Sequence, residues 1–125
     1  MSKSPTFLNL LVIRSENIDR AVTFYEAMGL VFEKHRHGSG PEHYACEQDG
    51  FVLEVYPLPS KQQATIGTRL GFSVNDLTSL LNTLAQIEVK IVSTPKDSEW
   101  GRRAVVKDFD GHTVELIEAT SPTAQ

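Results

Sequence analysis

Two glutamates occupy matched places in two similar segments of the chain. Residues 49–56 read DGFVLEVY and residues 110–117 read DGHTVELI, so Glu54 and Glu115 are each the sixth residue of a mostly apolar run. A carboxylate among buried strand residues is costly unless a cation, a metal or a hydrogen-bond donor faces it. The pair therefore predicts either a built site, with both glutamates as catalytic groups, or a duplicated fold.

Cationic side chains could complete such a site. If Arg69 shares a face with Glu54 or Glu115, and Arg14 points to the same cleft, the result is a mixed-charge pocket that suits a small carboxylate or zwitterion. The alternative is that Arg69 and a glutamate only lock two parts of the fold together. The expected ligand-binding residues are Arg69, Arg14, Tyr56, Trp100 and Arg102.

The aromatic candidates each have a second interpretation. Strand alternation puts Tyr56 on the face of Glu54, where it would line the cleft or pack with its hydroxyl in water. Trp100 lies in an expected loop, where it would cover the pocket or shield a sheet edge. His112 lies in a tight turn and is expected to be exposed.

The remaining histidines offer metal chemistry as an alternative. His35 and His37 share one face of an expected strand, and His43 opens the next. Imidazole is a good ligand for divalent metals. A divalent metal, if bound, would use Glu54 and Glu115 with His37 or His43. No metal or other cofactor is expected, however, because a polar His-x-His strand is more often a solvated face.

Apolar periodicity predicts the elements that position these residues. The first half should contain a helix from Ile18, capped by Ser15 or Asn17, and strands at 8–14, 30–37, 43–48 and 51–57. After a linker-like stretch at 57–67 the order restarts. The second half should contain a helix from Leu77, capped by Asn75 or Asp76, and strands at 68–74, 89–93, 102–108 and 112–118. Residues 94–101 are expected to form a loop.

The two halves also agree in spacing. Glu54 and Glu115 lie 61 positions apart, as do Asp49 and Asp110. This agreement indicates internal duplication. We expect one α+β domain over residues 1–125, made of two tandem βαβββ units at 8–57 and 68–118, whose curled mixed sheets surround a cleft.

The arrangement resembles the vicinal oxygen chelate superfamily, the glyoxalase, bleomycin-resistance and extradiol-dioxygenase group. Three stretches carry the resemblance: IDRAVTFYEAMGL at 18–30, DGFVLEVY at 49–56 and EWGRRAVVKDFDGHTVELIE at 99–118. Phe109 departs from the pattern, because the family usually has proline there. The resemblance implies a metal-dependent lyase, isomerase or dioxygenase, or a drug-binding protein, and frequent pairing of two copies.

The family's metal ligands are only half matched. The resemblance implies a histidine and a glutamate from the first and last strand of each unit. Glu54 and Glu115 match, but the other positions fall on Leu10 or Asn9 and on Arg69. Leucine cannot ligate a metal, and arginine has no acceptor atom. We therefore expect a small organic ligand bound without the usual metal. The alternatives are a glyoxalase I-like lyase, isomerase or dioxygenase with an atypical ligand set, and a dimeric interaction module.

Composition limits the partners. Twelve Lys and Arg residues against sixteen Asp and Glu residues give a net charge of −4, which argues against nucleic-acid binding. No apolar run approaches the length of a membrane span. The single cysteine, Cys46, cannot form an internal disulfide, which favours a reducing compartment such as the cytoplasm. The expected partners are a small molecule and a second copy in a homodimer, with no nucleic acid and no membrane.

Overall fold

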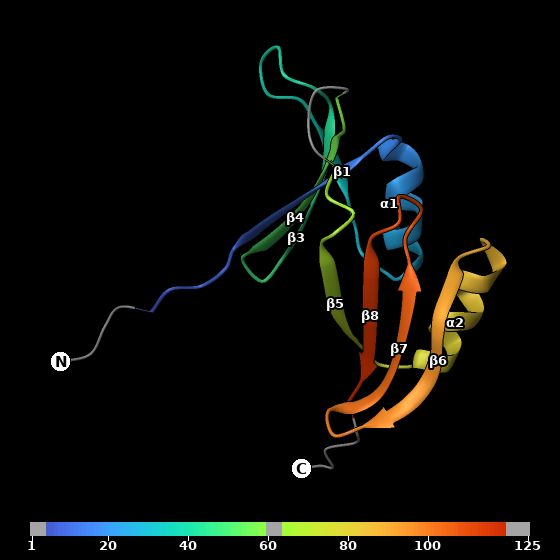
Figure 1. Ribbon diagram of the computed structural model, residues 1–125. Helices are drawn as coiled ribbons and strands as arrows, with labels where there is room; N and C mark the ends of the chain where they lie inside the picture. Colours follow the sequence, from blue (N-terminus) through green and yellow to red (C-terminus); the bar gives the residue numbers. More distant parts are fainter. Residues whose placement is uncertain (1–4, 60–63, 120–125) are drawn as a thin grey trace.

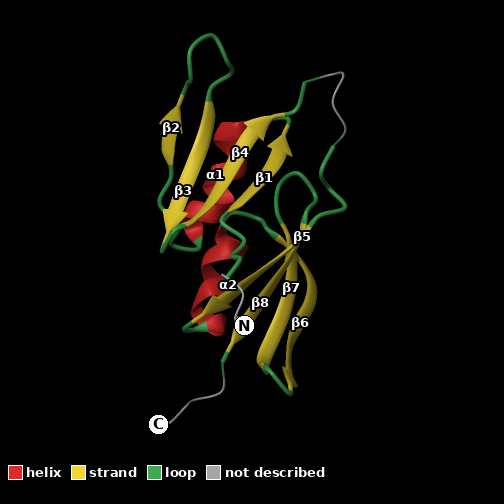
Figure 2. Cartoon of the chain, turned by 90° about the vertical axis from the view of Figure 1, so that its left-hand side faces the viewer, coloured by secondary structure: helices red, strands yellow, loops and turns green. Residues whose placement is uncertain are grey.

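A computed structural model describes residues 5–59 and 64–119, which form two four-stranded sheets (Figures 1 and 2). The first unit contains β1 (Leu10–Ser15), α1 (Ile18–Ala27), β2 (Glu33–His35), β3 (His43–Gln48) and β4 (Phe51–Pro57). The second unit contains β5 (Arg69–Val74), α2 (Leu77–Gln86), β6 (Lys90–Ser98), β7 (Gly101–Lys107) and β8 (Thr113–Glu118).

Both sheets have the same topology. The strand order is β1-β4-β3-β2 in the first sheet and β5-β8-β7-β6 in the second. In each, the outer parallel pair joins the first and last strands of the unit, and the other pairs are antiparallel. Val12 and Ala45 flank Glu54, as Gly71 and Val105 flank Glu115. The predicted α+β class and repeated βαβββ order are confirmed.

Capping residues fix where both helices begin. Asn17 caps α1 by accepting a hydrogen bond from the Arg20 N–H at 3.0 Å, and Asp76 caps α2 in the same way. These bonds satisfy backbone donors that have no partner inside the helix. Gly29, with φ of +99°, follows the end of α1, as the sequence indicated.

Each helix covers one face of its own sheet. The α1 helix packs on β1, β3 and β4, the α2 helix packs on β7 and β8, and the two helices touch each other (Figure 2). The buried cluster between them includes Ile13, Phe24, Tyr25, Leu53, Val55, Leu77, Leu84, Val106, Val114 and Leu116. The sheet face that turns away from the helix, here called the open face, carries Glu54 in the first unit and Glu115 in the second. No helix among the described residues has the length and apolar character needed to cross a membrane.

Two predicted boundaries are wrong. The β2 strand is three residues long, and not the eight of residues 30–37. The β6 strand runs to Ser98, so most of the expected loop at 94–101 is strand. Its register shifts twice, between Ile91 and Ser93 and between Ser93 and Lys96. Pro95 lies at the second irregularity. Because β6 is an edge strand and the pairing is interrupted there, the missing N–H of proline costs no hydrogen bond of the sheet.

Candidate functional site

The open face of the second sheet holds a carboxylate between two guanidinium groups. Arg69 of β5 donates through Nε to Glu115 at 2.6 Å, and Arg103 of β7 donates through Nε to the other carboxylate oxygen at 2.7 Å. The bond from Arg103, followed by that from Arg69, lowers the pKa of Glu115 to about 2. The carboxylate is therefore ionised and has a donor on each oxygen.

Sequence reasoning anticipated Arg69 in this arrangement but missed Arg103. The signal was present: Arg103 is the arginine of the Trp-Gly-x-Arg motif, and strand alternation places it on the same face as Glu115. Arg102, which was predicted instead, points to the opposite face. There its Nη1 donates to Thr78 Oγ1 at 3.0 Å, beside the start of α2.

The open face of the first sheet has different chemistry. Glu54 lies 3.9 Å from Nε2 of His43, whose side chain is only 1% exposed. Tyr56 stacks on the His43 ring with centroids 4.1 Å apart, and its hydroxyl lies 3.3 Å from the same Nε2. The Arg14 guanidinium lies over Tyr56, 5.2 Å from the ring centroid. The structure thus groups Arg14, Tyr56 and Glu54, while Arg69 and Glu115 belong to the other sheet.

Carboxylates dominate a broad hollow on this first face. The hollow measures about 640 Å³, and its walls include Glu33, Glu47, Asp49 and Glu54. Such a concentration of negative charge attracts cations and repels anions.

A smaller, apolar cavity lies where the two units meet. It measures about 230 Å³ and is lined by residues of both units, among them Leu11, Leu53, Leu70 and Phe72. Arg69 also lines it and is the one charged residue that does so in the part of the chain that the structure describes. An apolar cavity with one cationic group suits a single ring or branched chain that carries an anionic substituent.

Trp100 does not lie among these groups. It occupies the turn between β6 and β7 and is 68% exposed. A lid function at either cavity stays a prediction for this residue.

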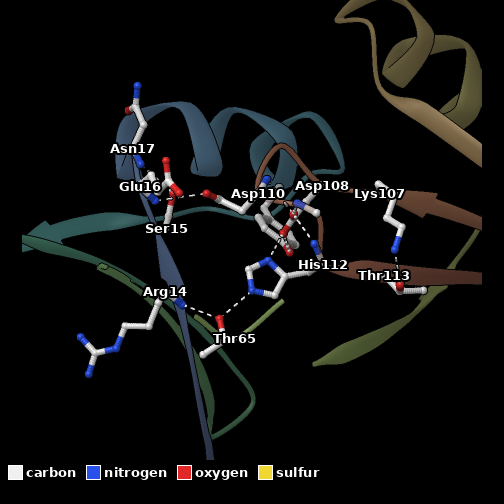
Figure 3. A network of polar contacts seen from close by, with 12 residues as sticks. Arg14, Ser15, Glu16, Asn17, Thr65, Lys107, Asp108, Asp110, His112 and Thr113 are labelled. Carbon is white, nitrogen blue, oxygen red and sulfur yellow. Dashed lines mark hydrogen bonds and ion pairs between the residues drawn. The ribbon is translucent and has the colours of Figure 1, made fainter. Parts of the chain in front are cut away.

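A buried polar network joins the two units (Figure 3). Asp108 Oδ2 accepts from the Tyr25 hydroxyl at 2.6 Å and from His112 Nδ1 at 2.8 Å. On the other side of the ring, His112 Nε2 lies 2.7 Å from Thr65 Oγ1, which in turn accepts the Arg14 N–H at 2.9 Å. A neutral imidazole that donates at Nδ1 and accepts at Nε2 satisfies all of these partners.

The expectation that His112 is exposed is wrong, because its side chain is fully buried. The turn folds inward since Asp108 Oδ1 accepts the backbone N–H groups of residues 110, 111 and 112. Burial alone would raise the pKa of Asp108, but the hydrogen bonds from His112 and Tyr25 outweigh it and leave the pKa lowered. Phe109, at the family's proline position, packs edge-on against Phe24 and under Arg20 of α1. This network is a lock between the units.

The residues at the family's metal positions do not fit a divalent metal. Both oxygens of Glu115 already accept from guanidinium groups, and the Arg69 charge would repel a dication. Leu10 has no ligand atom. Within the described residues, the groups of three potential ligands whose atoms lie within 4.8 Å are His35, His37 and His43, and Asp108, Asp110 and His112. Neither group contains Glu54 or Glu115, so the two glutamates do not form a metal site of the kind that the family's enzymes have.

The repeated units and their open faces define a protein of the two-unit βαβββ class. The chain belongs to the Glyoxalase/Bleomycin resistance protein/Dioxygenase superfamily, whose family model matches residues 7–116. The resemblance that the sequence indicated is confirmed.

The individual relatives have low sequence identity to this chain. An uncharacterized protein of Mycolicibacterium smegmatis is 27% identical over 105 residues, which cover 84% of this chain and 87% of that protein. The crystal structure of TnmS3, an antibiotic binding protein from Streptomyces sp. CB03234, superposes with a TM-score of 0.77 at 19% identity and covers 95% of this chain and 100% of that one. A glyoxalase/bleomycin resistance protein from the same Streptomyces gives a TM-score of 0.70 at 20% identity, covering 90% and 100%. At these identities the structural likeness shows the fold.

Proposed function

We propose that this protein binds a small organic anion or zwitterion without the metal that the family's enzymes use. The observation that carries the proposal is the apolar cavity between the units with Arg69 at its wall. The cavity accommodates one apolar group of the ligand, and the guanidinium faces its carboxylate. A relative in structure, TnmS3, is described as an antibiotic binding protein, which supports a binding role.

Arg69 is suited to binding an anionic ligand because one bond orients its guanidinium group and the terminal nitrogens remain available. Its Nε is fixed by Glu115, and the side chain is 50% exposed. In the described residues, that bond is the guanidinium's one hydrogen bond, which leaves the terminal nitrogens for a ligand. Glu115 thus acts as a positioning residue for Arg69.

A second copy of the chain completes the site in this proposal. Leu8 and Leu10 are 75% and 47% exposed at the start of β1, which is an edge strand of the first sheet, and β5 is an edge strand of the second. The first open face carries mainly carboxylates and the second carries Arg69 and Arg103, so the two faces are complementary in charge. Cys46 is free and buried, which supports a cytoplasmic location.

The test of ligand class uses a matched set of fluorinated benzoates, benzylamines and neutral benzamides, observed by ¹⁹F NMR. The benzoates should bind the native protein better than the amines and amides of the same shape. Arg69→Ala should weaken benzoate binding by about tenfold, the typical effect of losing one charge-assisted contact. Arg102→Ala is the matched control, because it removes a guanidinium from the opposite face.

Equal binding of all three probe classes, or benzoate binding that survives Arg69→Ala, would refute the proposed role of Arg69. Dimerisation is tested separately by light scattering. The native chain should have twice its 13.9 kDa mass, and Leu10→Asp should give the single mass. A single mass for the native chain would contradict the second copy while leaving the ligand test intact.

A further inference from the structure

Three histidines converge at one end of the first open face. His35 ends β2, His37 lies two residues further on, and His43 begins β3 directly across from His35. Each ring has a nitrogen within 4.8 Å of a nitrogen on both other rings. The ring centroids are 5.1 Å apart for His37 and His43, and about 6 Å for the other pairs. Topology brings them together, because the hairpin loop between β2 and β3 returns the chain to the same place.

Hydrogen bonds already orient two of the three rings. His43 Nδ1 lies 3.2 Å from the Pro41 carbonyl oxygen, and His35 Nε2 lies 3.2 Å from a Glu33 carboxylate oxygen. Since both partners only accept, each of these ring nitrogens is the donor. The second nitrogen of His35 remains for a metal, and that of His43 faces the Tyr56 hydroxyl at 3.3 Å, a contact that a bound ion would replace. A histidine that donates one N–H to a carbonyl or carboxylate and presents its second nitrogen is the usual arrangement around a bound metal.

The surroundings favour a cation. Glu54 lies 3.9 Å from His43 Nε2, and the adjoining hollow is lined by Glu33, Glu47 and Asp49. His43 is 1% exposed and stacked on Tyr56, so its ring is held in a fixed orientation. His37 is exposed and His35 is partly exposed, so both side chains have room to turn toward His43.

We propose that His35, His37 and His43 form a binding site for a first-row transition-metal dication of the Zn²⁺, Ni²⁺ or Cu²⁺ type. Imidazole is the ligand that these ions accept readily, in contrast to Mg²⁺ and Ca²⁺. Three nitrogens at tetrahedral metal distances lie about 3.3 Å from one another, so the two more exposed rings close by a small rotation. A fourth position stays open to water.

This site differs in place from the one that the family's metal enzymes use. Its ligands come from β2, the following loop and β3, and none comes from the first or last strand of either unit, which are β1, β4, β5 and β8. The inference does not depend on the proposed organic ligand, because the metal alone is the probe in its test.

The experiment is a titration of tag-free, chelator-treated full-length protein with Ni²⁺ by calorimetry, and with Co²⁺ by visible absorption. The native protein should bind one ion per chain, and Co²⁺ should give the intense bands of tetrahedral nitrogen coordination. His35→Ala and His37→Ala should each weaken binding by more than about tenfold, since even the hydrogen-bond partners of ligands have effects of that size. Both residues lie toward solvent, so these variants should fold.

Arg36→Ala is the matched control. It lies between the two histidines in the chain, is well exposed, and should leave the affinity unchanged. Binding that persists in the double variant His35→Ala/His37→Ala would overturn the proposal, as would the absence of any binding by the native protein. Binding that is lost in Asp110→Asn but kept in the double variant would assign the ion to the buried lock and equally refute the histidine site.

Discussion

The two open faces have the same strand order and a glutamate at the same place, yet the glutamates have different partners. Glu115 accepts from two guanidinium groups at 2.6 and 2.7 Å. Glu54 has one imidazole nitrogen at 3.9 Å and lies beside other carboxylates. The duplicated glutamate therefore has different partners in the two units. The strands determine where the side chain points, and the neighbours on each face determine its chemistry.

The segments that lead into the last strands, from the end of β3 in the first unit and the end of β7 in the second, differ just as much. Asp108, which lies 61 positions after Glu47, is buried and accepts hydrogen bonds from Tyr25, His112 and three backbone N–H groups. Glu47 is exposed on the acidic hollow. Among the described residues, the second turn forms side-chain hydrogen bonds to the opposite unit, through Asp108, Asp110 and His112, and the first turn forms none. The duplication is thus asymmetric: one turn stabilises the junction and the other leaves its face free.

The largest expected effect on stability comes from removing Asp108, and it tests the difference between Asp108 and Glu47. Asp108→Ala should lower the free energy of unfolding by about 3–5 kcal/mol, because the Tyr25 hydroxyl, the His112 ring and three backbone donors lose their acceptor in a buried place. Glu47→Ala, at the matched position, should change it by less than about 0.5 kcal/mol. Urea unfolding of both variants measures the difference. Equal losses would mean that the junction does not depend on the buried turn.

The next effect tests the two glutamates directly. Glu115→Gln should lower the free energy of unfolding by about 1–2 kcal/mol. It leaves two guanidiniums facing a neutral amide, but Arg69 and Arg103 are 50% and 33% exposed, so solvent offsets much of the loss. Glu54→Gln should cost less than about 0.5 kcal/mol, because its carboxylate accepts no hydrogen bond from the described residues and lies 3.9 Å from His43 Nε2. A larger loss from Glu54→Gln than from Glu115→Gln would contradict the conclusion that Glu115 has the stronger partners.

Sequence alone predicted the frame well, because local signals agree with the fold. Apolar alternation, the caps at Asn17 and Asp76, and the Asp-Gly turns determine the repeated order of elements. Alternation also placed Arg14 and Tyr56 on the face of Glu54 correctly. These features depend on residues that are close in the chain, so they are readable from it.

The contacts between units were not readable in the same way. Burial of His112 depends on Thr65, 47 positions away, and on an aspartate that gathers three backbone donors. Arg102 was predicted and Arg103 was not, and these adjacent residues point to opposite faces of the sheet, so a difference of one residue changes the face. The long β6 strand was missed because Pro95 reads as a strand terminator, whereas an irregular edge strand accommodates it.

The smallest effect is a change with pH in the difference between the native protein and Glu115→Gln. The pKa of Glu115 falls from 4.5 to about 2 on folding. A lowered carboxyl pKa adds stability that is fully present above the unfolded value and is lost as the pH falls toward the folded one. The difference in unfolding free energy of about 1–2 kcal/mol at pH 7 should therefore shrink progressively below pH 4.5. Asp108 also has a lowered pKa, but it is present in both proteins and cancels in the difference. Urea unfolding of both proteins from pH 7 to pH 3 measures this, and a difference that stays constant over that range would show that the guanidinium pair does not hold Glu115 in its ionised form.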